Sequence, residues 1–292
     1  MIKNNKKHID AKISKNINNF IILDIAGSNF SSTIEIVNFA LKKNQTDYAI
    51  ILTNASYISL LTNNLLQKNC VKNCYYICDY GAEIYDASSK TRTFFPINDT
   101  NKKLMLFHTG IMLSLCIVFS TKTTNYCYCN STYKFNNFLK EHQITCKRVD
   151  NFYSLNNILK ETDVLSFTFY DDSNDQIVQK FNIFKKLAES WKFNLSQVTE
   201  KYFSITNENV NKLNTIQKLL QNNNFLLINN FYYLALTSFD RQCWNFFNIN
   251  HLCSTECMVK INDIFMLNPA STKNFNIANL NKVIENIINK KI

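Results

Sequence analysis

Short apolar runs that alternate with longer amphipathic segments are the main structural signal in the sequence. Residues 20–25 form an isoleucine-rich run of the length and composition typical of a buried strand. The run carries an acid near its end, Asp24, and is soon followed by Gly27. A hydroxyl residue then caps a predicted helix whose apolar positions follow a helical period over residues 31–41.

The same pattern continues along the chain. Residues 48–53 predict a second buried strand and residues 56–68 a second helix. Strands and helices at this spacing predict right-handed crossovers and a parallel sheet. Residues 75–86 predict two short strands joined by a turn at Gly81. Near the C-terminus, helices are predicted at 210–220 and 277–288, and strands at 231–236 and 264–268.

From residue 98 to residue 206 the pattern changes to short strands and amphipathic helices, which predicts two β-rich α/β halves. Strands are expected at 111–120, 126–129, 144–148, 164–170 and 202–205, and helices at 133–141, 155–160 and 175–191.

Composition narrows the class of protein. The 292 residues are 46% hydrophobic and 13% aromatic, which indicates a folded chain with a substantial core. The polar segment 1–16 lacks the apolar stretch of a secretory signal and is predicted to be a flexible tail. No apolar run reaches the roughly 18 residues of a membrane span, so no membrane association is expected. The net charge of +10 comes from scattered basic residues, which argues against a nucleic-acid footprint.

The chain contains ten cysteines but no Cys-x-x-Cys pair, which gives little support to a zinc site. Several of them, such as Cys78 and Cys116, lie within apolar runs, where a free cysteine behaves as a small hydrophobic residue. We therefore expect reduced thiols with a mainly structural role and a cytoplasmic location.

An acid at the carboxyl end of a central strand lies where open α/β sheets place their ligands. The segment around Asp24 resembles motif one of the haloacid dehalogenase-like (HAD) phosphatases, Asp-x-Asp-Gly-Thr. Asp24 matches the first acid, Gly27 keeps its place and Ser28 replaces the threonine, whereas Ala26 stands where the second acid is expected. The resemblance implies that Asp24 is a vestigial nucleophile and that the acid/base group at position 26 is lost.

Further segments carry the resemblance. Thr53 stands at the strand-end hydroxyl of motif two, and Lys212 matches the lysine of motif three that neutralises phosphate and nucleophile. The segment around Gly81 is similar to the Asn-Gly-Ala-x-Ile-Tyr segment of the Cof-type subfamily. Where motif four has two acids, the alignment places Thr237 and Arg241, with Asp240 one residue away.

The resemblance implies an α/β fold with a doubly wound, mainly parallel Rossmannoid core sheet and an inserted α/β cap domain. The expected core comprises residues 17–97 and 207–292, and the expected cap residues 98–206. It also implies four residue sets. The catalytic positions are Asp24, Ala26, Thr53 and Lys212; the phosphate-binding residues are Gly27, Ser28, Thr53, Asn54, Lys212 and Arg241; the degenerate metal positions are Asp24, Thr237 and Asp240; and the cap's candidate ligand contacts are His108, His142, Lys147 and Arg148.

Family phosphatases use an aspartate nucleophile, Mg²⁺ and a second aspartate as acid and base. Because Ala26, Thr237 and Arg241 replace acids, the sequence favours a pseudophosphatase with a vestigial phosphate pocket. Such a protein is expected to act as a binding or scaffold protein for a small phosphorylated ligand or a protein partner. A weak or unconventional phosphatase that acts on small phosphorylated metabolites through Asp24, with Mg²⁺ as cofactor, is the alternative. An assembly or nucleic-acid partner recruited through the basic surface is a second alternative.

Overall fold

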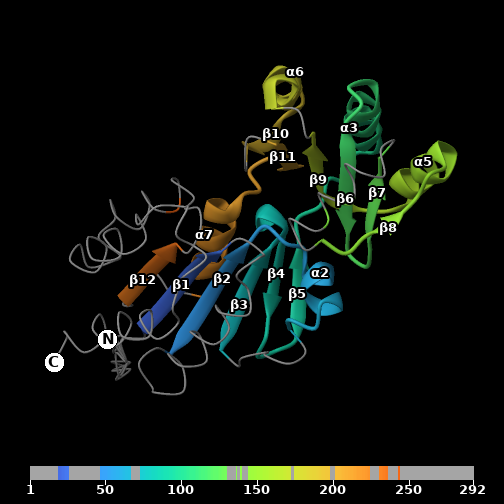
Figure 1. Cartoon of the computed structure of the whole chain (residues 1–292). Helices are drawn as coiled ribbons and strands as arrows, with labels where there is room; N and C mark the ends of the chain where they lie inside the picture. The colour runs from blue at the N-terminus through green and yellow to red at the C-terminus, as the bar shows by residue number, and fades with distance from the viewer. Residues whose placement is uncertain are drawn as a thin grey trace, which may run out of the picture.

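The computed structural model of the chain contains two β-sheets, each packed against helices (Figure 1). The residues that it describes are 19–25, 47–66, 73–129, 136, 139, 144–171, 174–197, 201–223, 230–235 and 243.

In the described part of the chain the first sheet has six strands in the order β12-β1-β2-β3-β4-β5. The pairs β12–β1, β1–β2 and β2–β3 are parallel, whereas β3–β4 and β4–β5 are antiparallel. Figure 1 shows the late strand β12 beside the first strand of the chain. The strands are β1 (Asn19–Ile25), β2 (Tyr48–Thr53), β3 (Cys74–Cys78), β4 (Glu83–Asp86), β5 (Thr91–Phe94) and β12 (Asn230–Ala235).

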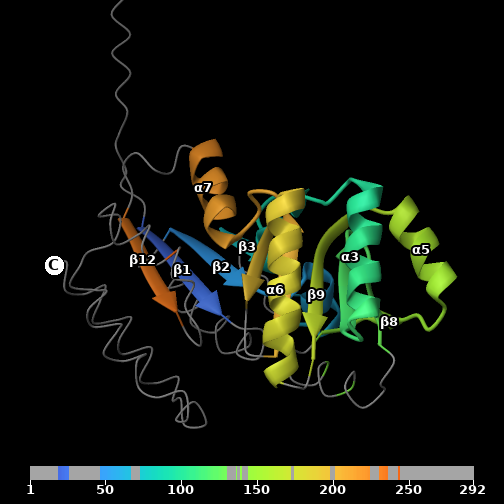
Figure 2. The ribbon, with the colours of Figure 1, turned by 90° about the horizontal axis from the view of Figure 1, so that it is seen from above.

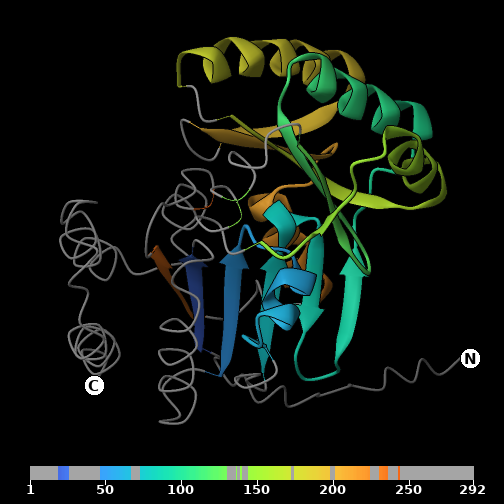
Figure 3. The same cartoon turned by 45° about the vertical axis from the view of Figure 1, so that its right-hand side comes forward.

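Helices cover both faces of this sheet, as a doubly wound fold requires. On one face, the ring of Tyr57 in α2 (Tyr57–Thr62) lies 4.8 Å from the ring of Tyr85 in β4. On the other, Ile216 of α7 (Lys212–Asn222) is buried in one cluster with Ile84. Neighbouring residues of a strand point to opposite faces, so α2 and α7 lie on opposite sides of the sheet (Figure 3).

The second described sheet also has six strands, in the order β10-β11-β9-β6-β7-β8. Its pairs are antiparallel except β7–β8, and the strands of the expected cap region form one continuous sheet. Three helices, α3, α5 and α6, cover its outer face (Figures 2 and 3). The elements are α3 (Thr100–Met112), β6 (Cys116–Thr121), β7 (Asn125–Tyr128), β8 (Lys147–Arg148), α5 (Phe152–Glu161), β9 (Val164–Tyr170), α6 (Asn174–Trp191), β10 (Phe193–Gln197) and β11 (Tyr202–Asn207).

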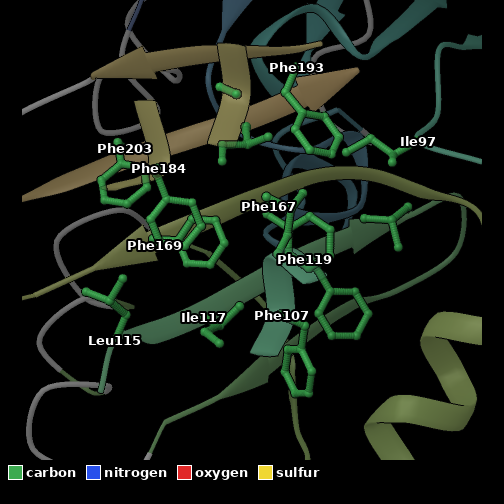
Figure 4. Packing of buried hydrophobic residues seen from close by; sticks show 14 of the residues in the cluster. Ile97, Phe107, Leu115, Ile117, Phe119, Phe167, Phe169, Phe184, Phe193 and Phe203 are labelled. Atoms are coloured by element: carbon green, nitrogen blue, oxygen red, sulfur yellow. The ribbon is translucent and has the colours of Figure 1, made fainter. Parts of the chain in front are cut away.

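Aromatic side chains fill the core between this sheet and its helices (Figure 4). The ring of Phe169 lies 4.3 Å from that of Phe184 in α6 and 5.3 Å from that of Phe203 in β11. Burying each such side chain contributes about 1.5–3 kcal/mol. Since Phe167 and Phe169 point into this core, Ser166, which precedes Phe167, points to the opposite face, toward the first sheet.

Helix α3 was not predicted, and residues 111–120 were expected to be a strand. The structure ends the helix at Met112 and starts β6 at Cys116. Asp99 caps α3 by accepting hydrogen bonds from the backbone N–H groups of Asn101 and Lys102. A Cβ added to Gly110 would lie 2.7 Å from side-chain atoms of Ile117 and Phe169, so this close packing outweighs the weak helix propensity of glycine.

Other elements also differ from the predicted ranges. Helix α2 ends at Thr62 rather than near residue 68, and β8 is shorter than the predicted 144–148. Strands β5 and β10 were not predicted. The helix predicted at 31–41, the strand at 264–268, the helix at 277–288 and most of the helix at 133–141 lie outside the described residues, as does the tail 1–16.

The chain passes from the first sheet to the second between β5 and α3, and returns between β11 and α7. These two crossings contact each other, because Asn207 Nδ2 donates to the carbonyl oxygen of Pro96 over 2.8 Å. The domain boundaries expected after residues 97 and 206 stay a prediction. Within the described residues, no helix has both the length and the apolar character that a membrane crossing demands.

Candidate functional site

The site begins at the carboxyl edge of the first sheet, where β1 and β2 run parallel. Their register places Asp24 opposite Leu52 and Ile25 opposite Thr53, so Asp24 and Thr53 lie at adjacent strand ends. Both side chains are buried. The Thr53 hydroxyl accepts a hydrogen bond from the backbone N–H of Ala55 over 3.1 Å, and Asn54 beside it is half-buried.

Lys212 is the first residue of α7, and its side chain reaches this edge. Its Nζ donates to Asp24 Oδ1 over 2.6 Å, and the two side chains are 11% and 0% exposed. A cation in the first turn of a helix opposes the helix dipole, so the buried carboxylate offsets an unfavourable position. Breaking such a buried pair by removing one partner costs about 3–5 kcal/mol.

The turn between β3 and β4 holds the start of α7 in place. Gly81 has a φ of +99°, and a Cβ at this position would lie 2.5 Å from the carbonyl group of Asn211. The hydroxyl of Thr215 in α7 donates to the Gly81 carbonyl oxygen over 2.8 Å. The prediction that residue 81 needs glycine for positive φ or close backbone approach is therefore confirmed, and this approach positions Lys212.

The structure therefore brings together Asp24, Thr53 and Lys212, which are separated by up to 188 positions in the sequence. Of the cap candidates, His108 bonds to Asn156 through its ring Nε2 over 3.1 Å, and Arg148 pairs with Asp150. Lys147 is exposed in β8. The remaining predicted residues lie outside the described ranges, and they are Ala26, Gly27, Ser28, His142, Thr237, Asp240 and Arg241.

Comparison with solved structures gives matches at the level of the fold. A haloacid dehalogenase-like hydrolase from B. subtilis has a TM-score of 0.61 at 12% identity, over 77% of this chain and 91% of that one. Another, from Bacteroides thetaiotaomicron, has a TM-score of 0.57 at 11% identity, over 75% and 81%. A HAD subclass IIB sugar phosphatase has a TM-score of 0.55 at 12% identity, over 77% and 90%.

The described fold is that of the haloacid dehalogenase-like hydrolases. The expected fold class, a doubly wound core sheet with an inserted α/β cap, is confirmed. Neither the protein-family models nor the curated proteins that were compared with the chain give a match.

A magnesium site in a HAD-like fold needs several oxygen ligands around the ion. The described residues at the sheet edge supply one carboxylate, Asp24, whose Oδ1 is bonded to an ammonium group. In the part of the chain that the structure describes, no three His, Cys, Asp or Glu side chains are grouped to hold a metal ion. These residues therefore do not by themselves complete a magnesium site.

A second buried acid was missed as a site residue by the sequence reasoning. Asp79 Oδ1 accepts hydrogen bonds from the hydroxyls of Ser166 over 2.5 Å and Ser120 over 3.3 Å, both in the second sheet. Its Oδ2 has no hydrogen-bond partner among the described residues. Burial raises the pKa of Asp79 to about 7, despite the two hydroxyls and with a contribution from the charge of Glu83. Its partners lie 41 and 87 positions away, so no local motif indicates them.

Proposed function

We propose that the chain is a catalytically degenerate HAD-like hydrolase, a pseudophosphatase that keeps a phosphate pocket and acts by binding. The observation that carries this proposal is the buried ion pair between Lys212 and Asp24 beside Thr53. It retains a cation and a hydroxyl at the sheet edge, where open α/β folds hold their ligands. The ligand that suits these groups is a small phosphorylated compound or a phosphate-bearing protein partner.

The sequence supports binding rather than turnover. Ala26 has no group that could act as acid or base, and a positioned acid/base contributes about 10²–10⁴-fold to rate. Thr237 and Arg241, at the aligned motif-four positions, are not carboxylates, and loss of metal-assisted charge stabilisation removes several further kcal/mol. The reduced thiols of the described cysteines support a reducing compartment such as the cytoplasm.

The second candidate function is weak phosphatase activity through Asp24. It is favoured by one observation, that Asp24 keeps its place at the strand end within bonding distance of Lys212. In that case Mg²⁺, the ion of the phosphatases that the chain resembles, is the expected cofactor. The structural similarity to a sugar phosphatase supports a small phosphorylated metabolite as its substrate.

An aryl-phosphate assay separates these two functions. The chain and its Asp24→Asn variant are incubated with p-nitrophenyl phosphate, each with and without Mg²⁺. The pseudophosphatase proposal expects the same background rate in all four samples. A Mg²⁺-dependent rate that Asp24→Asn abolishes would reject it in favour of the second candidate.

Binding is tested with inorganic phosphate by isothermal titration calorimetry. Binding is expected for the wild-type chain and is expected to be lost in Lys212→Gln, because the ammonium group is removed. Lys218→Gln is the matched control, since Lys218 lies exposed on the same helix. If Lys212→Gln does not fold, Thr53→Val removes the neighbouring hydroxyl instead. Equal phosphate binding in wild type and in the folded variants contradicts a pocket at this edge.

A further inference from the structure

The turn that follows β3 has an unusual backbone. Asp79, Tyr80 and Gly81 all have positive φ values, of 54°, 58° and 99°. Glycine adopts this left-handed conformation readily, but it is sterically disfavoured for residues with a side chain, and most of all for a bulky one such as tyrosine. Consecutive residues of this kind persist only where surrounding contacts hold them. The shape of this turn therefore depends on what it touches.

The second sheet holds the turn through the side chain of Asp79. Its Oδ1 accepts hydrogen bonds from the hydroxyl of Ser166 over 2.5 Å and from that of Ser120 over 3.3 Å. These two serines belong to β9 and β6, which are neighbours in the second sheet. The position of the turn is thus tied to the position of the second sheet.

The backbone of the same turn reaches both sides of the proposed phosphate pocket. The N–H of Asp79 donates to the carbonyl oxygen of Ala55 over 3.0 Å, and the N–H of Ala55 donates in turn to the Thr53 hydroxyl over 3.1 Å. At the other end of the turn, a Cβ on Gly81 would lie 2.9 Å from the backbone nitrogen of Lys212. Asp79 is therefore linked to Thr53 by two hydrogen bonds and to Lys212 by a close backbone approach.

The ionised form of Asp79 is poorly accommodated in this position. Its Oδ2 has no hydrogen-bond partner among the described residues, and burial raises its pKa to about 7. The charge that acts on it is that of Glu83, which pairs with Arg92, and its titratable neighbours are Cys78 and Tyr80. A buried carboxylate that faces no cation is stabilised by reaching water, so ionisation is expected to displace the turn.

We propose that Asp79 is a positioning residue of the phosphate pocket, which holds Thr53 and Lys212 in place while it is protonated and disturbs both when it ionises. This rests on the proposed function, because it takes the edge at Thr53 and Lys212 as the anion site. Two effects have the same sign. Displacement of the turn moves the start of α7, and β3 is parallel to β2, so the new negative charge lies at the same sheet edge and disfavours an anion.

The proposal links anion affinity to pH. Anion binding should weaken as the pH rises through about 7, where Asp79 loses its proton. Because coupling between two sites is reciprocal, a bound anion should also raise the pKa of Asp79.

The first test measures sulfate binding by isothermal titration calorimetry at pH 6 and pH 8. Sulfate replaces phosphate because phosphate itself changes charge in this range. The wild-type chain is expected to bind sulfate about fivefold or more tightly at pH 6 than at pH 8. In Asp79→Asn the side chain is neutral at both pH values, so this difference is expected to disappear. Asp86→Asn removes another acid of the same sheet and is the matched control, which should keep the difference.

Equal sulfate affinity at both pH values in the wild-type chain overturns the proposal, and so does a pH difference that survives in Asp79→Asn. If Asp79→Asn does not fold, Ser166→Ala is used, which keeps the carboxyl group and removes one hydrogen bond that lowers its pKa. The fall in sulfate affinity should then move to higher pH. A fall at an unchanged pH would contradict the role of Asp79.

Amide hydrogen exchange tests the positioning without a ligand. The backbone N–H groups of Asn214 and Thr215, at the start of α7, are bonded to Asn211. Their exchange, corrected for the intrinsic effect of pH, should be faster at pH 8 than at pH 6 in the wild-type chain and equal in Asp79→Asn. The N–H of Leu113, bonded within the turn that ends α3, is the internal control and should not respond.

The two measurements separate this proposal from the proposed function. Exchange at the start of α7 that is the same in the wild-type chain and in Asp79→Asn overturns the positioning role, whether or not sulfate binds. Absence of sulfate binding by the wild-type chain at both pH values overturns the phosphate pocket instead. The exchange result then decides alone whether Asp79 positions α7.

Discussion

Two aspartates of the first sheet are equally buried but have different partners. Asp24 is the penultimate residue of β1 and faces the ammonium group of Lys212, whereas Asp79 follows β3 and faces the hydroxyls of Ser120 and Ser166. A full positive charge offsets the cost of burying a carboxylate, and two hydroxyls do so only in part. The pKa of Asp79 is accordingly raised to about 7 by burial.

The comparison shows that the partners of a buried aspartate, and not its burial alone, decide its role in this fold. The Asp24 pair joins a carboxylate and an ammonium group at the edge where we propose that a phosphate binds. Asp79 instead holds a proton in the acidic range and joins the two sheets through hydroxyls that come from β6 and β9. The first arrangement suits recognition of an anion, and the second makes the contact between the sheets depend on pH.

The largest effect is expected from Lys212→Met, which leaves Asp24 buried without its cation. The free energy of unfolding, measured in urea, should fall by about 3–5 kcal/mol. The double variant Asp24→Asn/Lys212→Met should recover most of this loss, because no charge is then left buried. Lys218→Met, on the exposed side of α7, serves as control and should change little. A loss below about 1 kcal/mol for Lys212→Met would mean that the pair contributes little to the fold.

The second largest effect is a dependence of the free energy of unfolding on pH, caused by Asp79. Its pKa is about 7 in the folded chain against an ordinary 3.8, so the folded state holds the proton more tightly. The resulting stability is fully present below about pH 4 and is lost as the pH rises to about 7, by up to about 4 kcal/mol. In Asp79→Asn this loss should disappear, which urea unfolding at a series of pH values measures.

Asp86→Asn is the control for this experiment. Burial raises the pKa of Asp86, but hydrogen bonds from Ser88 and Ser89 outweigh it and lower the pKa overall. Asp86 therefore stabilises the fold above its ordinary pKa, and this contribution is lost as the pH falls. Removing it should change the pH profile only at the acidic end. An unchanged profile in Asp79→Asn would show that this aspartate is ionised in the folded chain.

A smaller effect is expected from Ser166→Ala, which removes the hydroxyl that lies 2.5 Å from Asp79 Oδ1. Hydrogen bonds to a charged group contribute about 1.5–3 kcal/mol, and those to a neutral group about 1 kcal/mol. The variant should therefore lose more stability at pH 8 than at pH 5, and the pKa of Asp79 should rise further. An equal loss of stability at both pH values would show that the Ser166 hydroxyl does not affect the pKa of Asp79.

Gly81→Ala tests the backbone that lies between the two aspartate environments. Gly81 follows Asp79 by two residues and packs against Asn211, the residue before Lys212. A non-glycine residue at this φ costs about 1–3 kcal/mol, and the methyl group also displaces the start of α7. We expect lower stability in urea and weaker binding of inorganic phosphate. A variant that binds phosphate like the wild type would show that the turn does not position Lys212.

The sequence was sufficient for the parts of the fold that rest on local periodicity. The strands that contain Asp24 and Thr53 and the turn at Gly81 were predicted because apolar runs and a rare glycine indicate them directly. The roles expected for Asp24, Thr53 and Lys212 came from resemblance, and they stay predictions although the structure places these residues together.

What escaped prediction depends on contacts between distant residues. Helix α3 contains Gly110, which local propensity disfavours and which only the packing against Ile117 and Phe169 explains. The two hydroxyl partners of Asp79 belong to different strands of the second sheet. Register and topology bring them together, and neither is encoded in a short motif.

The bond from Asn207 to the carbonyl oxygen of Pro96 has a mechanical consequence. The two connecting segments are thereby tied to each other where the chain passes between the sheets. A movement of the second sheet that drew the segments apart would have to break this bond, at a cost of about 1 kcal/mol. Asn207→Ala would remove that cost and leave the other bonds between the sheets in place.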